Sequence, residues 1–341
     1  EFSLYVGIPF CPTRCAYCSF VSASVEKTFA MIGPYLDALC REIALMGSAA
    51  AELGLKVKSL YIGGGTPTTL SPAQLQTLLR ALAQHFDLSR LCEYTVEAGR
   101  PDTVTAEKLA VLAENGVTRV SINPQTMEEA VLEAIGRRHS AADVYQAMEL
   151  AKASGIPHIN MDLIAGLPTD TPEGFSRTLD KCLALAPDNL TVHTLALKNG
   201  SRILLDGLPV PGAAEVGQML NYSAAHLSQA GYTPYYLYRQ KYMSGNFENV
   251  GWSKPGAEGL YNIYIMEELH SILSVGAGGS TKLVDPRTGH IVRHFNCKYA
   301  KEYLEKPEKW TQNGAQFFAF ERALLRDYGL LPEENTEGSD S

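Results

Sequence analysis

Three cysteines within eight residues are the feature of this sequence that points most directly to chemistry. Cys11, Cys15 and Cys18 stand in the stretch CPTRCAYC, separated by three and then two residues. Thiolates at these spacings can wrap a compact inorganic cluster, whereas a structural zinc site normally takes four ligands, and no nearby Cys or His pair supplies the fourth. A cubane of four irons and four sulfides held by three cysteines leaves one iron open. We therefore predict a catalytic [4Fe–4S] site, with a zinc ion completed by a distant histidine as the alternative.

Short apolar runs alternate with amphipathic stretches along the first part of the chain, and the cysteine loop follows the first run. Strands are predicted at 4–8, 57–62, 93–97, 119–123, 158–164 and 190–194, and helices between them, including 34–53 and one that begins at Ser71-Pro72. Strands separated by helices imply parallel βαβ crossovers and an α/β fold. We predict a partial (β/α)6 TIM-like barrel over residues 1–200, with its chemistry at the carboxyl ends of the strands.

The pattern changes after Pro209. A helix is predicted over 213–229, followed by a tyrosine-rich segment, a glycine-rich stretch, a strand near 272–276 and helical sequence. We interpret residues 201–330 as an α+β extension that covers the barrel mouth. The acidic, polar tail 331–341 is expected to be disordered.

The Cys-x3-Cys-x2-Cys motif after the first strand of a parallel α/β chain resembles that of the radical S-adenosylmethionine (SAM) superfamily. The resemblance implies that the open iron binds the amine and carboxylate of SAM. An electron from the cluster then cleaves the sulfonium C–S bond, giving methionine and a 5′-deoxyadenosyl radical. The resemblance also implies that one or two SAM molecules bind and that an electron donor such as flavodoxin or ferredoxin reduces the cluster. Tyr17 fits the aromatic position that shields the adenine.

A glycine-rich stretch follows the second predicted strand. Gly63, Gly64 and Gly65 let the backbone approach a ligand closely, and with Thr66 they offer amides to the methionine end of SAM. No Gly-Lys-Ser/Thr follows, so the stretch is not a phosphate-binding loop. One βα unit after the cysteine loop, it supports the same cofactor site.

The resemblance narrows, from Leu4 to about Lys282, to the branch that contains oxygen-independent coproporphyrinogen III dehydrogenases and radical-type heme chaperones. Residues at positions that line the cofactor site in this branch are Tyr5, Glu97, Gln125, Arg137 (with Arg138 as the fallback), Asp162 and Ala196. The match implies that Asp162 takes the ribose hydroxyls. Singly, Glu97 and Asp162 could cap helices and Arg137 could be a solvated charge. Together, at the ends of successive strands in family order, they predict a SAM site.

The substrate of the dehydrogenases carries four carboxylates, so its pocket needs cations and a large apolar wall. The segment 232–242 holds five tyrosines, together with Arg239 and Lys241. We take Arg239, Lys241 and Lys254 as propionate-binding candidates, and Tyr5, Arg239 and Lys241 as the catalytic set. The alternative is a half-buried strand with alternating aromatic residues.

Two departures from the branch separate the functional hypotheses. Phe20 stands where well-studied dehydrogenases have a fourth cysteine, and Tyr261-Asn262-Ile263-Tyr264-Ile265-Met266 lacks the His and Trp of the chaperones' His-Asn-x-x-Tyr-Trp motif. The leading hypothesis is oxidative decarboxylation of coproporphyrinogen III to protoporphyrinogen IX. A heme-binding chaperone and a radical methyltransferase or tetrapyrrole-modifying enzyme that uses two SAM molecules are the alternatives, and His193, His270 and Arg239 are the residues to mutate to separate them.

Composition limits the partners. The net charge of −8 and the pI near 5.6 argue against a polyanion such as nucleic acid. No apolar run is long enough for a membrane span and no signal peptide precedes the first strand, so a cytoplasmic protein is expected. Seven cysteines, an odd number, argue against a disulfide framework. Divergent coproporphyrinogen dehydrogenases often have an extra N-terminal region, and the abrupt start leads us to expect one here.

Overall fold

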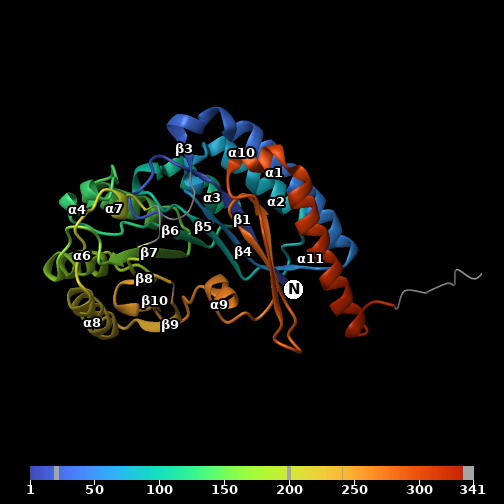
Figure 1. The fold of residues 1–341 in the computed structure, drawn as a ribbon. Helices are drawn as coiled ribbons and strands as arrows, with labels where there is room; N and C mark the ends of the chain where they lie inside the picture. The colour runs from blue at the N-terminus through green and yellow to red at the C-terminus, as the bar shows by residue number, and fades with distance from the viewer. Residues whose placement is uncertain (19–22, 198–200, 240, 333–341) are drawn as a thin grey trace, which may run out of the picture.

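The computed structural model describes residues 1–18, 23–197, 201–239 and 241–332. Phe20 and all but the first two residues of the predicted tail therefore lie outside the described residues. Within these ranges, the largest sheet has eleven strands in the order β13-β12-β11-β1-β4-β5-β6-β7-β8-β10-β9. Figure 1 shows this sheet as one curved layer that runs through the molecule.

The middle of the sheet consists of six adjacent parallel strands. These are β1 (Phe2–Ile8), β4 (Val57–Gly64), β5 (Glu93–Glu97), β6 (Arg119–Ser121), β7 (His158–Ala165) and β8 (Asn189–Thr194). The alternation of strands and helices in the sequence predicted this arrangement, because parallel neighbours need a crossover connection. The predicted α/β class and all six predicted strands are confirmed, with ends that differ by at most two residues.

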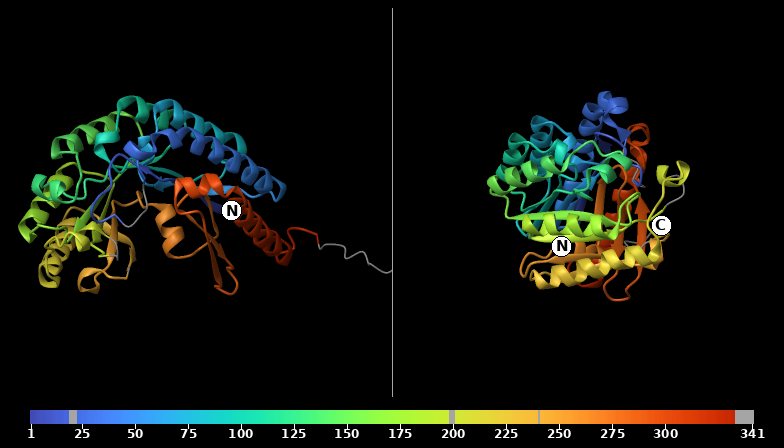
Figure 2. Two further views of the ribbon diagram at one scale, coloured as in Figure 1. Left: turned by 45° about the horizontal axis from the view of Figure 1, so that its top comes forward. Right: turned by 90° about the vertical axis from the view of Figure 1, so that its left-hand side faces the viewer.

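Helices cover the outer side of the curved sheet, and the short helix α9 (Leu260–Met266) lies on its inner side (Figure 2). The crossover helices are α1 (Val25–Glu52), α2 (Pro72–His85), α3 (Ala106–Glu114), α4 (Glu129–Ala134), α5 (Ala141–Ala153) and α6 (Pro172–Ala184). The helix predicted to begin at Ser71-Pro72 opens with a capping box, in which the Ser71 hydroxyl accepts from Gln74 N and the Gln74 side-chain oxygen accepts from Ser71 N. Helix α2 turns Leu75, Leu78 and Leu82 into the core.

Helix α1 is longer than predicted, because it begins at Val25 and contains Pro34 within it. We expected the helix to begin at proline, which suits a first turn. A proline farther along costs the hydrogen bond of its missing N–H. The buried side chains of Tyr35, Leu39 and Ile43 offset that cost by packing against the sheet.

The chain after residue 201 adds strands to both edges of the same sheet. Strands β9 (Thr233–Tyr238) and β10 (Asn249–Ser253) continue it antiparallel beyond β8. On the other side, β11 (Ile272–Gly276) runs parallel to β1 and is followed by β12 (Ser280–Val284) and β13 (Ile291–Phe295). The helices of this region are α7 (Arg202–Leu205), α8 (Ala213–Gln229), α9 (Leu260–Met266), α10 (Ala300–Glu305) and α11 (Pro307–Asp327). The five strands of this region therefore extend the same sheet as the six parallel strands.

Several short elements lie in the connections between the strands and helices. They are the two-stranded ladder of β2 (Phe10–Cys11) and β3 (Ala23–Ser24), and the 3-10 turns η1 (Pro67–Thr69), η2 (Pro101–Thr103) and η3 (Ser244–Asn246). None of the helices in the described part of the chain has the length and apolar character needed to cross a bilayer.

Candidate active site

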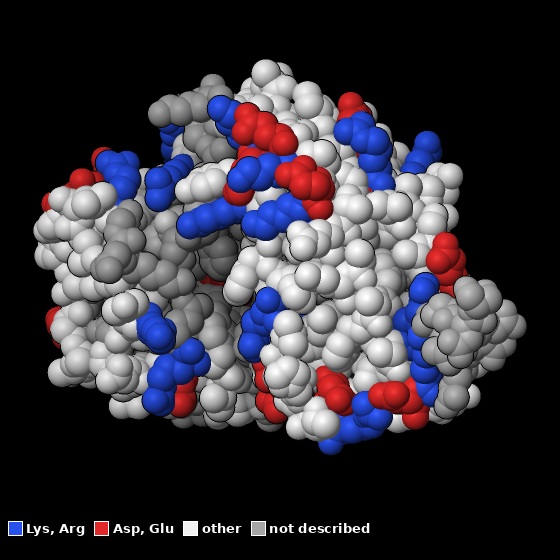
Figure 3. All heavy atoms as spheres, turned by 45° about the vertical axis from the view of Figure 1, so that its right-hand side comes forward, with Lys and Arg blue, Asp and Glu red and all other residues white. Residues whose placement is uncertain are grey.

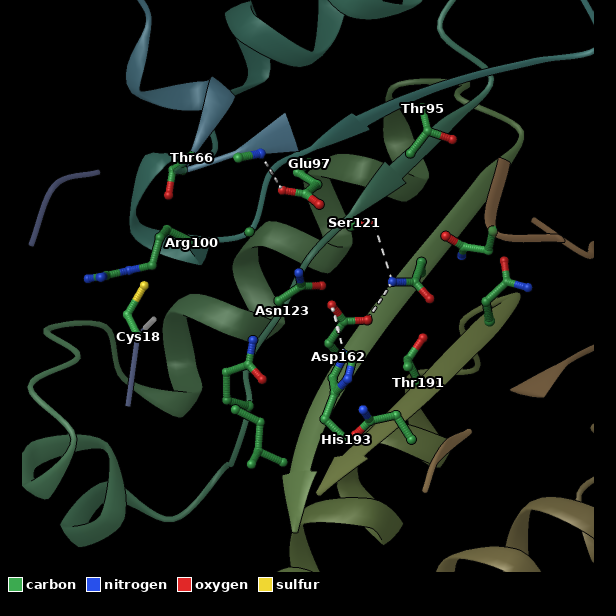
Figure 4. Close-up of a pocket in the computed structure, with 18 of the residues that line it drawn as sticks. Cys18, Thr66, Thr95, Glu97, Arg100, Ser121, Asn123, Asp162, Thr191 and His193 are labelled. Atoms are coloured by element: carbon green, nitrogen blue, oxygen red, sulfur yellow. Dashed lines mark hydrogen bonds and ion pairs between the residues drawn. The ribbon is translucent and has the colours of Figure 1, made fainter. Parts of the chain in front are cut away.

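A cavity of about 360 Å³ lies between the cysteine loop and the inner face of the parallel strands. Residues two apart on a strand face the same side, so each strand contributes alternate side chains. These are Thr95 and Glu97 from β5, Ser121 and then Asn123 beyond the end of β6, Asn160 and Asp162 from β7, and Thr191 and His193 from β8 (Figure 4). Closed barrels usually fill this space with Val, Ile and Leu. The polar lining predicts a ligand site instead.

All three cysteines of the motif contribute to the cavity wall. Cys11 is the last residue of β2, and Cys15 is only 8% exposed. Backbone hydrogen bonds from Ala16 N to Ile135 O (2.9 Å) and from Cys18 N to Cys15 O (3.2 Å) fix the loop. Among the described residues, no group of three or more His, Cys, Asp or Glu side chains is arranged to hold a metal ion. The ligand set Cys11, Cys15 and Cys18 therefore stays a prediction.

The glycine turn lies against the loop that carries the cysteines. A Cβ on Gly65 would stand 2.5 Å from Phe10 O, and Gly64 has a φ of +110°, so both positions require glycine. The amides are bonded within the chain: Gly64 N donates to Glu97 Oε2 (3.2 Å) and Thr66 N donates to Phe10 O (2.7 Å). Gly64, Gly65 and Thr66 line the cavity. Cofactor binding by this turn therefore stays a prediction, and its carbonyl oxygens and the Thr66 hydroxyl face the same cavity as its amides.

Two carboxylates face the cavity in different states. Glu97 accepts a hydrogen bond from Tyr61 Oη (2.6 Å), and burial raises the pKa of Glu97 to about 7. Burial alone would also raise the pKa of Asp162. Hydrogen bonds and the nearby His193 instead hold it below its ordinary value, with Asn160 Nδ2 donating at 2.8 Å and His193 Nε2 lying 3.7 Å from Asp162 Oδ2. Near neutral pH, Asp162 is a charged acceptor and Glu97 is close to its titration midpoint.

Gln125 and Arg137 complete the polar wall. Gln125 has a φ of +67°, uncommon for a residue with a side chain, and its N–H donates to Asp162 O (3.0 Å). Arg137 donates from Nη1 to Asn123 O and from Nη2 to Gly99 O (3.2 Å). Three buried atoms of this wall, Asn123 Oδ1, Gln125 Oε1 and Arg137 Nε, have no hydrogen-bond partner in the described structure. Such atoms suit a polar ligand that supplies the missing donors and acceptor.

Some of the remaining residues predicted to bind the cofactor line the cavity, and others do not. Tyr17 and Ala196 line the cavity, as do Glu97, Gln125, Arg137 and Asp162, whereas Arg138 is not among its lining residues. Tyr5 lies behind the glycine turn, where its ring stacks on Tyr61 and Tyr261 at centroid distances of 6.1 and 6.3 Å. Burial raises the pKa of Tyr5 far above its ordinary value, so the phenol stays protonated. A catalytic role for Tyr5 remains a prediction.

The cations proposed to hold propionates do not line the cavity. Arg239 is 57% exposed in its side chain and pairs with Glu248 Oε1 at 2.8 Å. Lys241 is exposed, and Lys254 Nζ donates to Ala186 O (3.0 Å). Propionate binding by these three cations remains a prediction, and their positions outside the cavity do not support it.

Three arginines line the cavity instead, and two of them, Arg100 and Arg119, were not predicted. Arg119 lies at the start of β6, where its Nε is 3.4 Å from Glu93 Oε2 and its Nη1 donates to Asn189 Oδ1. Both charges are buried, so they anchor the inner wall together. The signal was present in the sequence, since Glu93 and Arg119 open neighbouring predicted strands with opposite charges. Arg100 closely follows the end of β5.

The tyrosine-rich segment supplies part of the cavity after all. Tyr235, Tyr236 and Tyr238 line it, whereas Tyr232 is buried elsewhere with its hydroxyl on Pro187 O (2.6 Å) and Tyr242 is exposed. Three of the five tyrosines therefore give the cavity an aromatic part of its wall.

Only one of the two histidines chosen for mutation belongs to the site. His193 lines the cavity, with Nδ1 3.3 Å from Tyr238 Oη. His270 Nε2 lies 2.6 Å from Ser3 Oγ, and His270 is not a lining residue. Asn262 and Met266 of α9 also line the cavity.

One face of the molecule is hollowed, and Lys and Arg side chains gather above and below the hollow (Figure 3).

The combined substitution Arg239→Gln and Lys241→Gln is expected to leave the SAM cleavage and substrate conversion predicted from the sequence within about twofold of the parent. Both side chains are exposed and outside the cavity, and a surface ion pair such as Arg239–Glu248 contributes little. Production of 5′-deoxyadenosine and of the substrate's product should be measured with each substitution alone as the control. A loss beyond tenfold would return these cations to the substrate site.

Comparison with known proteins connects this cavity to a family. The family model described as the radical SAM superfamily matches residues 5–182. That range includes the cysteine loop, the glycine turn and the polar residues of β5 and β7.

Curated relatives and a solved structure agree. The oxygen-independent coproporphyrinogen-III oxidase-like protein HemZ of Bacillus subtilis is 42% identical over 320 residues, which are 93% of this chain and 64% of that protein. The heme chaperone HemW of Lactococcus lactis is 33% identical over 299 residues, 86% of this chain and 73% of that protein. Coproporphyrinogen III oxidase (HemN) from Escherichia coli, a radical SAM enzyme, has a TM-score of 0.73 at 25% identity, covering 90% of this chain and 69% of that one. The chain thus spans less than two thirds of the HemZ relative, and the likeness to HemN confirms the predicted fold class.

Proposed function

Because the chain belongs to the radical SAM superfamily, we propose that Cys11, Cys15 and Cys18 hold a [4Fe–4S] cluster and that the cavity beside them binds and cleaves SAM. When bound, the reduced cluster supplies the electron that breaks the sulfonium C–S bond of SAM. The observation that carries the proposal is the shared cavity, with the cysteine loop on one side and polar residues of successive strands on the other.

The polar wall matches the chemistry of SAM group by group. Asp162, charged and supported by His193, is a strong acceptor for the ribose hydroxyls. Arg137, with its Nε unpartnered, is a donor for the methionine carboxylate. Glu97 is an acceptor for the methionine ammonium, and binding this cation favours the ionised form of Glu97.

We further propose that the substrate is coproporphyrinogen III. Each of two propionates would lose a hydrogen atom to a 5′-deoxyadenosyl radical, release carbon dioxide, pass one electron to an external one-electron acceptor, and leave a vinyl group. The names of the HemZ and HemN relatives support this choice, as do Tyr235, Tyr236 and Tyr238 on the cavity wall. A reductant such as flavodoxin or ferredoxin would supply the electron for SAM cleavage.

The deciding experiment is an anaerobic incubation of reconstituted protein with a strong reductant, SAM and coproporphyrinogen III. Mass spectrometry is expected to find loss of two carbon dioxides from the porphyrinogen, with 5′-deoxyadenosine and methionine. If 5′-deoxyadenosine appears while the porphyrinogen stays intact, the SAM chemistry is retained and the substrate is another molecule. S-adenosylhomocysteine among the products would instead indicate methyl transfer with a second SAM.

A heme chaperone is the second candidate, and the HemW relative favours it. The stretch that corresponds to the chaperones' His-Asn-x-x-Tyr-Trp motif forms α9, in which Tyr261 stands at the position of the histidine and Met266, which lines the cavity, at that of the tryptophan. Titration with hemin tests this candidate. Tight one-to-one binding without porphyrinogen turnover would replace the enzyme by the chaperone.

A further inference from the structure

We propose that Arg100, oriented by Asp102, is a positioning residue that sets the charge around the Cys15 sulfur and thereby the reduction potential of the cluster. The inference rests on the proposed cluster and is independent of the substrate. It begins from the burial of Arg100, which is only 2% exposed although it carries a full positive charge. A buried cation needs partners on all sides of its guanidinium.

One edge of that guanidinium faces the cysteine loop. Arg100 Nη1 donates to Thr13 Oγ1 at 2.9 Å and to Cys15 Sγ at 3.8 Å. Both acceptors belong to the same loop, so Arg100 helps to hold the loop and contacts one of its sulfurs, beside Arg137, which also interacts with Cys15. Cys11 differs, since its Sγ has the neutral hydroxyl of Thr66 at 3.3 Å.

The other edge of the guanidinium is held by a carboxylate. Arg100 Nε lies 3.1 Å from Asp102 Oδ1, and Nη2 lies 3.3 Å from Asp102 Oδ2. This two-point contact fixes the plane of the guanidinium and leaves Nη1 aimed at the loop. Asp102 is 27% exposed in its side chain, so water screens its charge more than that of Arg100.

The backbone around Arg100 is also fixed. Thr103 Oγ1 donates to Arg100 O at 2.7 Å and lies 2.6 Å from Thr68 Oγ1. Lys108 Nζ donates to Thr68 O (2.6 Å) and to Thr103 O (3.0 Å), which ties turn η1 to turn η2. Because these contacts join the turns after β4 and β5, they fix the backbone from which the Arg100 side chain reaches Cys15.

Reduction adds one negative charge to a cluster and its thiolates. A cation and its N–H groups at a thiolate stabilise the reduced form more than the oxidised form, and so raise the reduction potential. Burial of Cys15 and Arg100 limits screening by solvent, which strengthens the effect. Asp102 acts in the opposite sense, because its negative charge disfavours an added electron.

The test is a redox titration of the reconstituted protein monitored by electron paramagnetic resonance, without SAM or substrate. Arg100→Gln is expected to shift the midpoint to a more negative potential, and Arg100→Lys, which keeps the charge but not the fork, to an intermediate value. Asp102→Asn is expected to shift it in the opposite direction, to a more positive potential. Arg14→Gln, on the exposed part of the same loop, is the matched control and should leave the midpoint unchanged.

Opposite signs for the two substitutions separate electrostatic tuning from structural damage, which would have no reason to reverse. An unchanged midpoint in Arg100→Gln with full iron content would overturn the proposal, as would shifts of the same sign in both variants. If Arg100→Gln does not retain iron, the Asp102→Asn variant tests the proposal: a shift of its midpoint to a more positive potential supports it, and a shift in the other direction or no shift overturns it. Absence of a cluster in the parent chain would instead overturn the proposed function itself.

Discussion

Cys15→Ala is expected to abolish the broad absorbance near 400 nm that an iron–sulfur cluster gives after anaerobic reconstitution, and with it all SAM cleavage. With two of three thiolates left, the cluster loses one of its anchoring bonds and the others cannot compensate. The fold should persist, because the backbone around the loop is held by Ala16 N on Ile135 O and by Cys18 N on Cys15 O. The unfolding free energy is expected to change by about 1 kcal/mol, as for a small truncation.

Iron content, visible absorbance and thermal unfolding should be measured together on the same preparation. Cys92→Ala is the matched control, since Cys92 is exposed and lies far along the chain in the loop before β5. Cys92→Ala should bind as much iron as the parent. Full iron content and unchanged absorbance in Cys15→Ala would refute the assignment of the motif.

The parallel strands could be predicted from sequence because each is a short apolar run bounded by helix signals. The order of β1, β4, β5, β6, β7 and β8 in the sheet follows their order in the chain, so local pattern and topology agree. The two edges of the sheet could not be predicted in the same way. Strand β11 pairs with β1 across more than 260 residues, since Leu4 is opposite Leu273, and nothing local in either strand specifies that partner.

The same distinction applies to the site. Glu97, Gln125 and Asp162 could be located because the residue at the end of a parallel strand must face the same edge as its neighbours. The tyrosine-rich segment was harder, because the alternation of a strand does not reveal which face is inward. Arg239 and Lys241 come after the last residue of β9, beyond the part that faces the cavity.

Glu97→Gln is expected to weaken SAM binding roughly ten- to hundredfold, the effect of losing one charge-assisted hydrogen bond. The substitution keeps the size of the side chain and an oxygen that can accept from Tyr61 Oη, now at 2.6 Å from Glu97 Oε1. It removes the charge that we assign to the methionine ammonium. Equilibrium binding of SAM to the reconstituted protein measures the effect. Affinity within twofold of the parent would exclude Glu97 from the ammonium site, while Glu114→Gln, at the exposed end of α3, should bind normally.

The pH dependence of Glu97→Gln gives a second and independent test. Burial raises the pKa of Glu97 from 4.5 to about 7, so the unfolded chain ionises this carboxyl first and the parent loses stability as pH rises between those values. Above pH 7 the accumulated cost is at most about 3 kcal/mol. Glutamine cannot ionise, so the stability of the variant relative to the parent should increase from pH 5 to pH 8 in denaturant titrations of the protein without SAM. Over the same range the parent should bind SAM more tightly as Glu97 ionises, and the variant should not. A stability difference that is flat with pH would mean that Glu97 is not desolvated in the folded chain.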